Sequence, residues 1–448
     1  MATWDMFLDA ALASLAARKL LFHTQVIALE PQPPVPETFM GPGSWDRATV
    51  EFRLESASQQ EWLSEDGEES LSVPEDDMNR KLILFSGNDY MCLSSHPAVR
   101  EAAAKAVQQY GMGPRGSPLI SGYTTYHKMV EESLAELKKT EDCILCPTGF
   151  SANLAVMTAL GSISSLLSVG RKPAEDERVA IFSDALNHAS IIDGIRLVER
   201  QKEGIVFVYK HCDMSHLDFL LSSCSMGKKI VITDSLFSMD GDFAPLPELV
   251  KLRKKHGFLL VVDDAHGTLV CGDNGGGVPE MFACQNEIDI SIGTLSKAVG
   301  CLGGFISCSN RWKRLIVSRG RTFIFSTALP VPIVASVHAA IYVSNEERWR
   351  RSVIWGHVQY FASLTKIDIK SHVISIVVGS EDAVLKASRH LLRSGYLVTP
   401  IRPPFVPPNS CRLRITLSVA HSLDDIKRLV DALTPWLPAK HACMLSGE

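Results

Sequence analysis

Residues 258–304 constrain the fold of this chain more than any other stretch. Two short apolar runs, 258–262 and 288–292, are rich in β-branched residues and bounded by turn residues. Such runs are typical of buried parallel strands. The first is followed by Asp263-Asp264-Ala265-His266-Gly267 and the second by Gly293-Thr294-Leu295-Ser296-Lys297. Open α/β sheets bind ligands at the carboxyl ends of their strands, so we expect these polar groups to share one site.

The residue types in these two segments suit pyridoxal phosphate (PLP). Lys297 supplies an amine for the aldehyde, Asp263 a carboxylate for the pyridine nitrogen, and Thr294 or Ser296 a hydroxyl for the phosphate. Each group alone has a simpler explanation: a Ser-Lys pair is usually on the surface, Asp-Asp usually forms a turn or helix cap, and His266 suits a packed core. The joint pattern favours the cofactor site.

The chain from 178 to 308 alternates regularly between strand and helix patterns. This alternation predicts an α/β fold with a mostly parallel central sheet and right-handed crossovers. His188 and Ser238 follow two more of the predicted strands, so we expect them in the same crevice. The strands are expected at 178–183, 205–209 and 229–233, and the helices at 189–203, 214–223 and 246–256.

The 448 residues suggest two to three domains. We expect an N-terminal arm, helix and insertion at 1–95, a large α/β domain at 96–330, and a smaller C-terminal α+β domain at 331–448. Within the first, 1–29 predicts an amphipathic packing helix, and 31–80 an exposed insertion with one strand at 48–54. The C-terminal domain should contain a long helical region at 333–366, then strands at 373–378, 396–398 and 411–417 and helices at 381–394 and 422–435.

Composition excludes several partners. The net charge of −5 gives no electrostatic basis for binding nucleic acid or an anionic membrane, and no apolar run approaches the about 20 residues that cross a bilayer. The eleven cysteines show no disulfide or zinc spacing, which predicts a reducing compartment and no metal site. Cys143 and Cys146 are expected to pack. We expect the cytosol, with the peroxisome as the alternative, although residues 446–448 are not a peroxisomal tripeptide.

Three further places carry candidate residues. Thr148 is a natural cap for a helix whose first amides, Gly149 and Phe150, form an anion site, although Phe150 also suits a plain core position. Asn88 either stabilises a turn or contacts a substrate. Arg402, held among prolines, either clamps a carboxylate or is solvent-exposed.

From about residue 80 to 435 the chain resembles the α-oxoamine synthases, PLP-dependent acyl-CoA:amino-acid acyltransferases of fold type I, the aminotransferase-like fold. Residues 401–406, Ile-Arg-Pro-Pro-Phe-Val, are similar to members that condense L-alanine with pimeloyl-CoA, specifically plant-type chains. The motifs that carry the resemblance are Ser86-Gly-Asn-Asp-Tyr90, Thr148-Gly-Phe-Ser-Ala-Asn153, Asn187-His-Ala-Ser190, Phe237-Ser-Met-Asp-Gly-Asp242, Asp263-Asp-Ala-His-Gly267 and Thr294-Leu-Ser-Lys297.

The resemblance implies a role for each residue around the cofactor ring. Lys297 would bind the PLP aldehyde as a Schiff base, and Asp263 would pair with the pyridine nitrogen. His266 would bind the phenolic oxygen, His188 would stack on the ring, and Ser238 would support the cofactor. Lys297, His188, Asp263 and His266 are thus the expected catalytic residues.

The resemblance also implies how phosphate and substrates are held. Thr294, with the amides of Gly149 and Phe150, would hold the phosphate, and Ser326 would reach the phosphate of the second subunit in a homodimer with active sites at the interface. Arg402 would bind the amino-acid carboxylate, while Asn88 and His188 would contact the substrate. The implied reaction is a decarboxylative condensation that releases CoA and CO2.

The chain departs from the family pattern in two substrate-contact positions. Phe405 stands where bacterial relatives have Thr, and no residue near Thr24 matches their N-terminal substrate arginine. The insertion at 31–80 is also absent from the short bacterial form. Two alternatives therefore stay open: a sister enzyme that condenses glycine with a short acyl-CoA, and a non-catalytic PLP-fold subunit.

Overall fold

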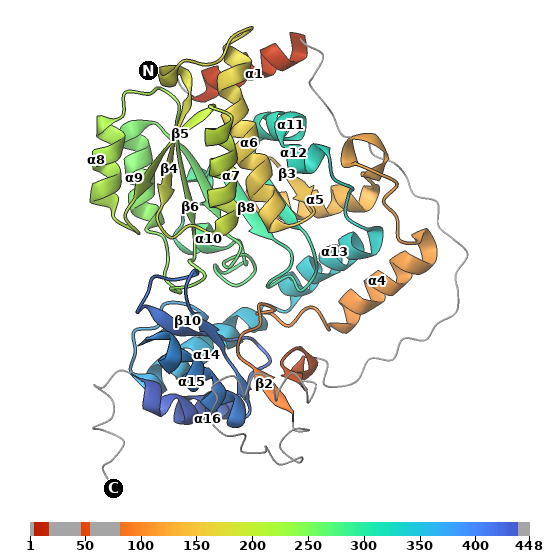
Figure 1. Cartoon of the computed structure of the whole chain (residues 1–448). Coiled ribbons are helices and arrows are strands. Elements are labelled where there is room, and N and C mark those ends of the chain that lie inside the picture. Colours follow the sequence, from red (N-terminus) through yellow and green to blue (C-terminus); the bar gives the residue numbers. More distant parts are fainter. Residues whose placement is uncertain (1–3, 18–45, 54–80, 438–448) are drawn as a thin grey trace. The chain divides into compact units, whose positions relative to one another are not determined.

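The computed structural model describes residues 4–17, 46–53 and 81–437, which form two compact units (Figure 1). The large unit comprises 4–17, 97–237 and 243–348 of these residues, and the small unit comprises 46–53, 81–96, 238–242 and 349–437. The predicted domains were continuous, whereas each unit combines separate segments. The helix α13 (Val331–Glu346) belongs to the large unit rather than to a C-terminal domain.

The large unit is built on a seven-stranded sheet in the order β3-β9-β8-β7-β6-β4-β5. Strands β8, β7, β6, β4 and β5 pair in parallel, which confirms the mostly parallel sheet. Strand β9 is antiparallel to both β3 and β8, a reversal that the alternation did not predict. The strands are β3 (Asp142–Cys146), β4 (Val179–Asp184), β5 (Gly204–Tyr209), β6 (Lys229–Asp234), β7 (Leu259–Asp263), β8 (Ile290–Thr294) and β9 (Gly304–Cys308).

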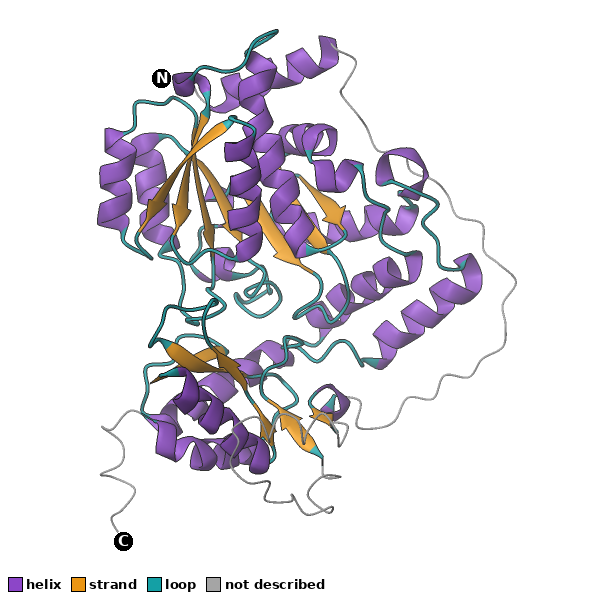
Figure 2. Ribbon diagram, viewed as in Figure 1, coloured by secondary structure: helices purple, strands orange, loops and turns teal. Residues whose placement is uncertain are grey.

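Helices surround this sheet (Figure 2). Apolar residues of α1, α6, α7 and α11 join strand residues in one buried cluster, which accounts for the near-continuous apolar strand sequences. The helices are α1 (Trp4–Ala17), α4 (Pro97–Tyr110), α5 (Thr125–Lys138), α6 (Gly149–Leu167), α7 (Ala189–Arg200), α8 (Met214–Ser223), α9 (Leu246–His256), α10 (Val278–Met281), α11 (Asn310–Arg319), α12 (Arg321–Ile324) and α13, with short turns η2 (Pro118–Gly122), η3 (Glu175–Glu177) and η4 (Gln285–Glu287).

Helix α6 corrects one expectation from the sequence. Its 19 residues are long and apolar enough to cross a bilayer by length and composition, so the statement that no apolar run approaches that length was wrong. However, 72% of its apolar window is buried inside the protein. The helix is apolar on all sides because it packs against the sheet, α1, α7 and α11, as expected for the core helix of a large α/β unit.

Helix α1 packs on the large unit, as predicted for the N-terminal arm. Leu8, Leu12 and Leu15 are buried against the core, and Trp4 Nε1 donates to the Lys229 carbonyl at 2.8 Å. The remainder of the predicted helix at 1–29 lies outside the described residues.

The small unit is α+β, as predicted. It has two three-stranded sheets, β1-β2-β11 and β10-β13-β12, which share a core with its helices. The predicted helix at 333–366 is two helices, α13 and α14, because the chain leaves helical geometry at Glu347. Most of the 31–80 insertion lies outside the described residues. The elements are η1 (Arg47–Thr49), β1 (Glu51–Phe52), β2 (Leu82–Leu84), α14 (Trp349–Thr365), β10 (Val373–Gly379), α15 (Glu381–Arg393), β11 (Tyr396–Leu397), β12 (Thr399–Ile401), β13 (Cys411–Thr416), α16 (Leu423–Leu433) and η5 (Thr434–Trp436).

Candidate active site

The carboxyl ends of the parallel strands bring polar residues to one edge of the large unit's sheet. Asp184, Asp234, Asp263 and Thr294 are the last residues of β4, β6, β7 and β8. Asp234 and Asp263 are direct partners in the β6–β7 register. The structure therefore places the predicted residues Asp263 and Thr294 at the same edge of the sheet. Asp234 lies at this edge as well.

Lys297 and His266 meet above this edge. Lys297 Nζ lies 2.8 Å from His266 Nε2, although the two residues are 31 positions apart in the sequence. His266 is buried and Lys297 is half-buried. The sequence predicted that these two residues share a site, and the structure confirms it.

The turn that carries His266 is anchored by a second carboxylate. Asp264 accepts hydrogen bonds from Lys138 Nζ and Ser235 Oγ, each at 2.6 Å. Both members of the Lys138–Asp264 pair are buried, with 2% and 0% of their side chains exposed. Asp263 turns the other way and accepts from the Ala265 amide at 2.9 Å. Asp264 thus holds the turn, and Asp263 remains available to the site.

Asp263 is oriented by a residue that sequence analysis did not assign. Asn153 Nδ2 donates to Asp263 Oδ2 at 2.6 Å and to Ser190 Oγ at 2.9 Å. Ser190 Oγ lies 2.8 Å from Nδ1 of His188, so one hydrogen-bonded chain joins Asp263 to His188. Asn153 and Ser190 are both 1% exposed.

His188 is the N-cap of α7, and its backbone amide donates to Asp234 Oδ2 at 2.8 Å. His188 is an exposed residue whose pKa is nevertheless lowered by desolvation; the Asp263 carboxylate raises that pKa, and the cationic Lys297 lowers it. Burial raises the pKa of Asp234 well above its usual value, and the nearby Asp263 carboxylate adds to that shift. The ring of His188 is therefore favoured in its neutral form.

The predicted anion site lies at the start of α6. Thr148 caps the helix through its side chain, which leaves the first amides, those of Gly149 and Phe150, for a ligand. A Cβ at Gly149 would lie 3.0 Å from Thr294 Cβ, so a larger residue there would press against this strand end. Thr294 Oγ1 and Ser296 Oγ, 2.8 Å apart, add hydroxyl groups at the same place.

Phe150 is not the core residue of the simpler interpretation. It is 42% exposed, and its ring contacts that of His188 edge-on, with the ring centroids 6.5 Å apart. The helix start and the histidine are therefore neighbours.

The donor set fits PLP. The anion site suits the phosphate, Asp263 the pyridine nitrogen, His266 the phenolic oxygen, and the Lys297 amine the aldehyde. In addition, Asn153 Oδ1 is buried without a hydrogen-bond partner among the described residues. Unpaired buried polar atoms are rare, and one beside Asp263 indicates a site built for function rather than stability.

Ser326 lies in the large unit at a different opening. It lines a small cavity together with Cys146, Pro147 and Thr327. Glu131 in the same cavity accepts from Tyr123 Oη at 2.8 Å and from Lys313 Nζ at 2.9 Å. Neither Lys297 nor His266 lines this cavity. The structure of the single chain thus does not join Ser326 to them.

Asn88, Ser238 and Arg402 belong to the small unit, so their predicted roles remain predictions. Asn88 is exposed, and its Oδ1 accepts from Tyr90 Oη at 3.0 Å. The Ser238 carbonyl accepts from Arg414 Nε at 2.6 Å. The Arg402 side chain is 50% exposed and lies 3.8 Å from a Glu381 carboxylate oxygen.

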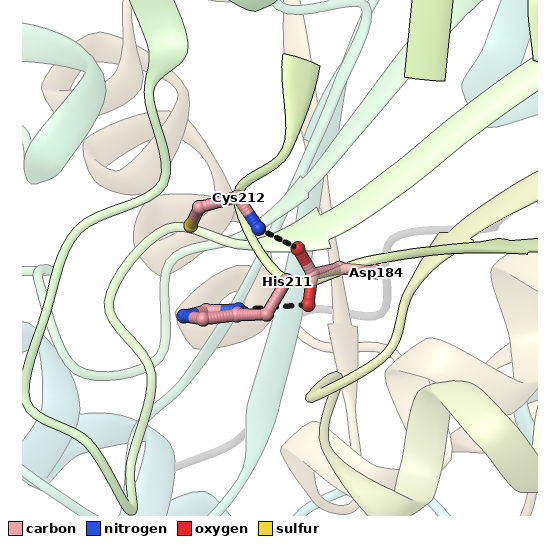
Figure 3. A group of neighbouring side chains, drawn as sticks. All are labelled: Asp184, His211 and Cys212. Atoms are coloured by element: carbon pink, nitrogen blue, oxygen red, sulfur yellow. Dashed lines mark hydrogen bonds and ion pairs between the residues drawn. The ribbon is translucent and has the colours of Figure 1, made fainter. Parts of the chain in front are cut away.

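Asp184, His211 and Cys212 bring three possible metal ligands together (Figure 3). The carboxylate of Asp184 already accepts from the Cys212 amide at 2.9 Å and lies 2.9 Å from His211 Nδ1. It also accepts from the Leu186 amide. These contacts join the ends of β4 and β5, so the cluster has a structural explanation. Cys143, on the buried strand β3, has a pKa raised to about 12 by burial, as expected of a packed thiol.

The sequence also matches a known family. The model of the family described as aminotransferase class I and II matches residues 80–433, and the chain therefore belongs to that family. Among its relatives, 8-amino-7-oxononanoate synthase of Arabidopsis thaliana is 55% identical over 97% of this chain and 96% of that protein. The same enzyme of Geobacter sulfurreducens is 38% identical over 79% of this chain and 88% of that protein.

Solved structures agree with the fold. Serine palmitoyltransferase of Sphingomonas wittichii has a TM-score of 0.72 at 28% identity, covering 80% of this chain and 89% of that one. 8-Amino-7-oxononanoate synthase of Francisella tularensis has a TM-score of 0.66 at 24% identity, covering 79% and 97%. A structure of SPT with PLP has a TM-score of 0.72 at 27% identity, covering 80% and 88%.

The comparisons confirm the predicted fold class, the PLP-dependent family and the similarity to acyltransferases named 8-amino-7-oxononanoate synthase. The site residues that sequence analysis missed are Asn153, Ser190 and Asp234. A signal existed for Asn153, which is a polar residue within the apolar sequence of α6. A signal existed for Asp234 as well, because it directly follows the strand predicted at 229–233. Ser190 follows an ordinary cap pattern, and only the fold links it to Asp263 through Asn153.

Proposed function

We propose that this chain condenses L-alanine with pimeloyl-CoA, releasing CO2 and CoA, to give 8-amino-7-oxononanoate. The observation that carries the proposal is the 55% identity to the Arabidopsis enzyme of that name, which extends over nearly the full length of both chains. The geometry around Lys297 supports the same conclusion, because a non-catalytic subunit has no use for an amine held 2.8 Å from a buried imidazole.

PLP, when bound, supplies an electrophilic aldehyde and a cationic ring that withdraws electrons from the substrate's Cα. In the proposed arrangement, the α6 amides and Thr294 bind its phosphate, and Asp263 keeps the ring nitrogen charged. His266 would bind the phenolic oxygen, and His188 would pack against the ring. Each assignment rests on the position of the side chain at the carboxyl edge of the sheet.

Lys297 is the proposed proton carrier. Its Nζ would hold the cofactor's aldehyde and, as a free amine, would remove the Cα proton of L-alanine. His266 Nε2, at 2.8 Å, keeps this amine at the site. The neutral form of His188, favoured by its lowered pKa, avoids placing another positive charge beside Lys297.

Arg402 and Asn88 are the proposed substrate residues, as the family resemblance implies. Arg402 is half-exposed, and its nearest carboxylate, on Glu381, is 3.8 Å away, so its guanidinium has donors available for a substrate carboxylate. Phe405, which is 73% exposed, replaces the bacterial threonine with an apolar surface. These positions, rather than the PLP residues, should set the choice between alanine and glycine.

We also propose that the enzyme is a homodimer with Ser326 reaching the partner's site. Two segments of the large unit, 111–122 and 321–328, carry apolar side chains that a monomer leaves in water: Met112 is 62% exposed, Ile120 76% and Phe325 71%. Ser117 Oγ donates to the Ile324 carbonyl at 2.9 Å, which ties the two segments together. Apolar exposure on this scale is typical of a protein interface.

Residence in the cytosol is a further proposal, with the peroxisome as the alternative. All cysteines in the described ranges are free, which suits a reducing compartment. Fluorescence microscopy of the full-length chain, tagged once at each terminus and compared with a peroxisomal marker, tests it.

An assay with paired substrates tests the proposed reaction. The PLP-loaded protein is given alanine, glycine or serine with either pimeloyl-CoA or acetyl-CoA, and the released CoA thiol is measured. The proposal predicts that alanine with pimeloyl-CoA gives the highest kcat/KM. A preference for glycine with acetyl-CoA would move the chain to a sister enzyme, and no thiol release with any pair would favour the non-catalytic subunit.

A further inference from the structure

The hydrogen bonds of His188 determine where its proton lies. Its Nδ1 accepts from the backbone amide of Ser190 at 3.2 Å, and a backbone N–H can only donate. Nδ1 is therefore unprotonated. Ser190 Oγ, 2.8 Å from the same nitrogen, must then direct its own hydrogen toward it. A neutral ring with an unprotonated Nδ1 carries its hydrogen on Nε2.

A hydroxyl that donates in this way still has lone pairs that can accept a hydrogen bond. Asn153 Nδ2 supplies it at 2.9 Å. The orientation of the Asn153 amide is itself fixed, because its other contact, at 2.6 Å, is a carboxylate oxygen of Asp263, which can only accept. A flipped amide would place two oxygens against each other. Every bond in the chain from Asp263 to His188 thus has one allowed direction.

We propose that Asn153, acting through Ser190, is a positioning residue that fixes His188 as its Nε2–H tautomer while it orients Asp263. The importance of the two oriented residues rests on the proposed function. The location of Asn153 favours this role, because the residue is buried one turn into the apolar helix α6 and leaves its Oδ1 unpaired among the described residues. A residue kept only for stability would satisfy that atom.

The charges around His188 are compatible with the neutral tautomer. Asp263 attracts a proton to the ring, whereas Lys297 repels it, and desolvation also opposes it. Asp234 contacts the backbone amide of His188 rather than its ring. The Ser190 hydroxyl stabilises the neutral ring by donating to Nδ1, so its removal should raise the pKa of His188 and release the tautomer.

The test is a ¹⁵N-histidine NMR measurement on the PLP-loaded protein, with the His188 signal assigned by its loss in His188→Gln. In the wild type, Nδ1 should show the shift of an unprotonated nitrogen from pH 6 to pH 8. In Asn153→Ala and in Ser190→Ala this shift should move toward mixed tautomers. Ser162→Ala is the matched control, because Ser162 is a buried serine of α6 whose hydroxyl bonds only within the helix.

A second readout tests the link to Asp263. The dissociation constant for PLP, measured by absorbance, should rise by about 10-fold in Asn153→Ala, since a hydrogen bond to a charged group is lost, and by much less in Ser190→Ala. An unchanged His188 tautomer in both variants would overturn the proposal, and Ser190→Ala keeps it testable if Asn153→Ala fails to fold. A wild type that holds the tautomer but makes no product would refute the proposed function and leave the positioning role intact.

Discussion

At the scale of single residues, the adjacent carboxylates of Asp263 and Asp264 have different roles. Asp263 faces the hydrogen-bonded chain through Asn153, whereas Asp264 is enclosed by Lys138, Ser235 and Thr268. A buried ion pair of this kind is costly to break, because removing one partner leaves the other charge without compensation. Lys138 therefore stabilises the turn that carries His266 without touching the site.

This arrangement gives a stability prediction. Lys138→Met should lower the free energy of unfolding by about 3–5 kcal/mol, because it leaves the fully buried Asp264 unpaired. Adding Asp264→Asn should recover part of that loss. Lys128→Met is the control, since Lys128 is 54% exposed and forms only a surface pair with Glu132, so it should change stability by less than about 0.5 kcal/mol. Urea unfolding measures all three, and equal effects at the two lysines would contradict the account.

The sequence predicted most of the site residues at strand ends, although Asp234 at the end of β6 was missed. Asp263, His266, Thr294 and Lys297 follow two recognisable buried strands, so the general geometry of parallel sheets was enough to group them. Asn153 lies in a helix, α6, rather than at a strand end. No local sequence pattern predicts which strand a helix will pack against. The direction of its hydrogen bonds depends on distances that only the fold supplies.

At the scale of elements, local caps and tertiary contacts act together. Helix α6 starts with a capping box at Thr148, and the same start presents amides for an anion. Helix α16 also has a capping box, between Ser422 and Asp425, and Asp425 further pairs with Arg47. The cap of α16 therefore also holds the segment around η1 to the small unit.

The pKa of Asp425 predicts how this contact responds to pH. Burial alone would raise that pKa, but the hydrogen bonds from Arg47 and Ser422 outweigh it and lower it to about 2, below the usual 3.8. A lowered folded pKa gives stability that is present above pH 3.8 and is lost as the pH falls toward 2. Asp425→Asn should thus cost about 1 kcal/mol at pH 7, and the difference from wild type should close between pH 4 and pH 2.

Thermal unfolding across this pH range checks the prediction. Asp424→Asn is the control, because Asp424 lies in the same first turn but is 61% exposed and pairs only with Arg428. A loss at Asp425 that stays constant down to pH 2 would show that its charge has no part in the effect.

Element boundaries were predicted where helix periodicity and end signals agree. Helices α8 and α9 begin and end at the predicted residues. The break between α13 and α14 was missed because the sequence stays compatible with a helix there, and the chain passes instead from one unit to the other. The antiparallel strand β9 was missed because an apolar run in the sequence does not reveal whether a strand runs parallel or antiparallel to its neighbours.

At the scale of the whole molecule, the two exposed segments 111–122 and 321–328 predict assembly. Ile120→Asp should convert a dimer into a monomer, because a charge at a residue buried by the partner is costly to desolvate. Val169→Asp is the control, since Val169 is 70% exposed but lies outside both segments. Light scattering after size exclusion measures the mass. A wild-type monomer, or an Ile120→Asp dimer, would contradict the proposed assembly.

The most direct test of the central claim follows the carbon atoms of the amino acid. The PLP-loaded protein is given pimeloyl-CoA and alanine labelled with ¹³C either at the carboxyl carbon or at the methyl carbon, and the products are analysed by mass spectrometry. We predict that the carboxyl label leaves as CO2 and that the methyl label stays in 8-amino-7-oxononanoate, with no product from Lys297→Ala. A carboxyl label retained in the product, or equal turnover by Lys297→Ala, would contradict the account.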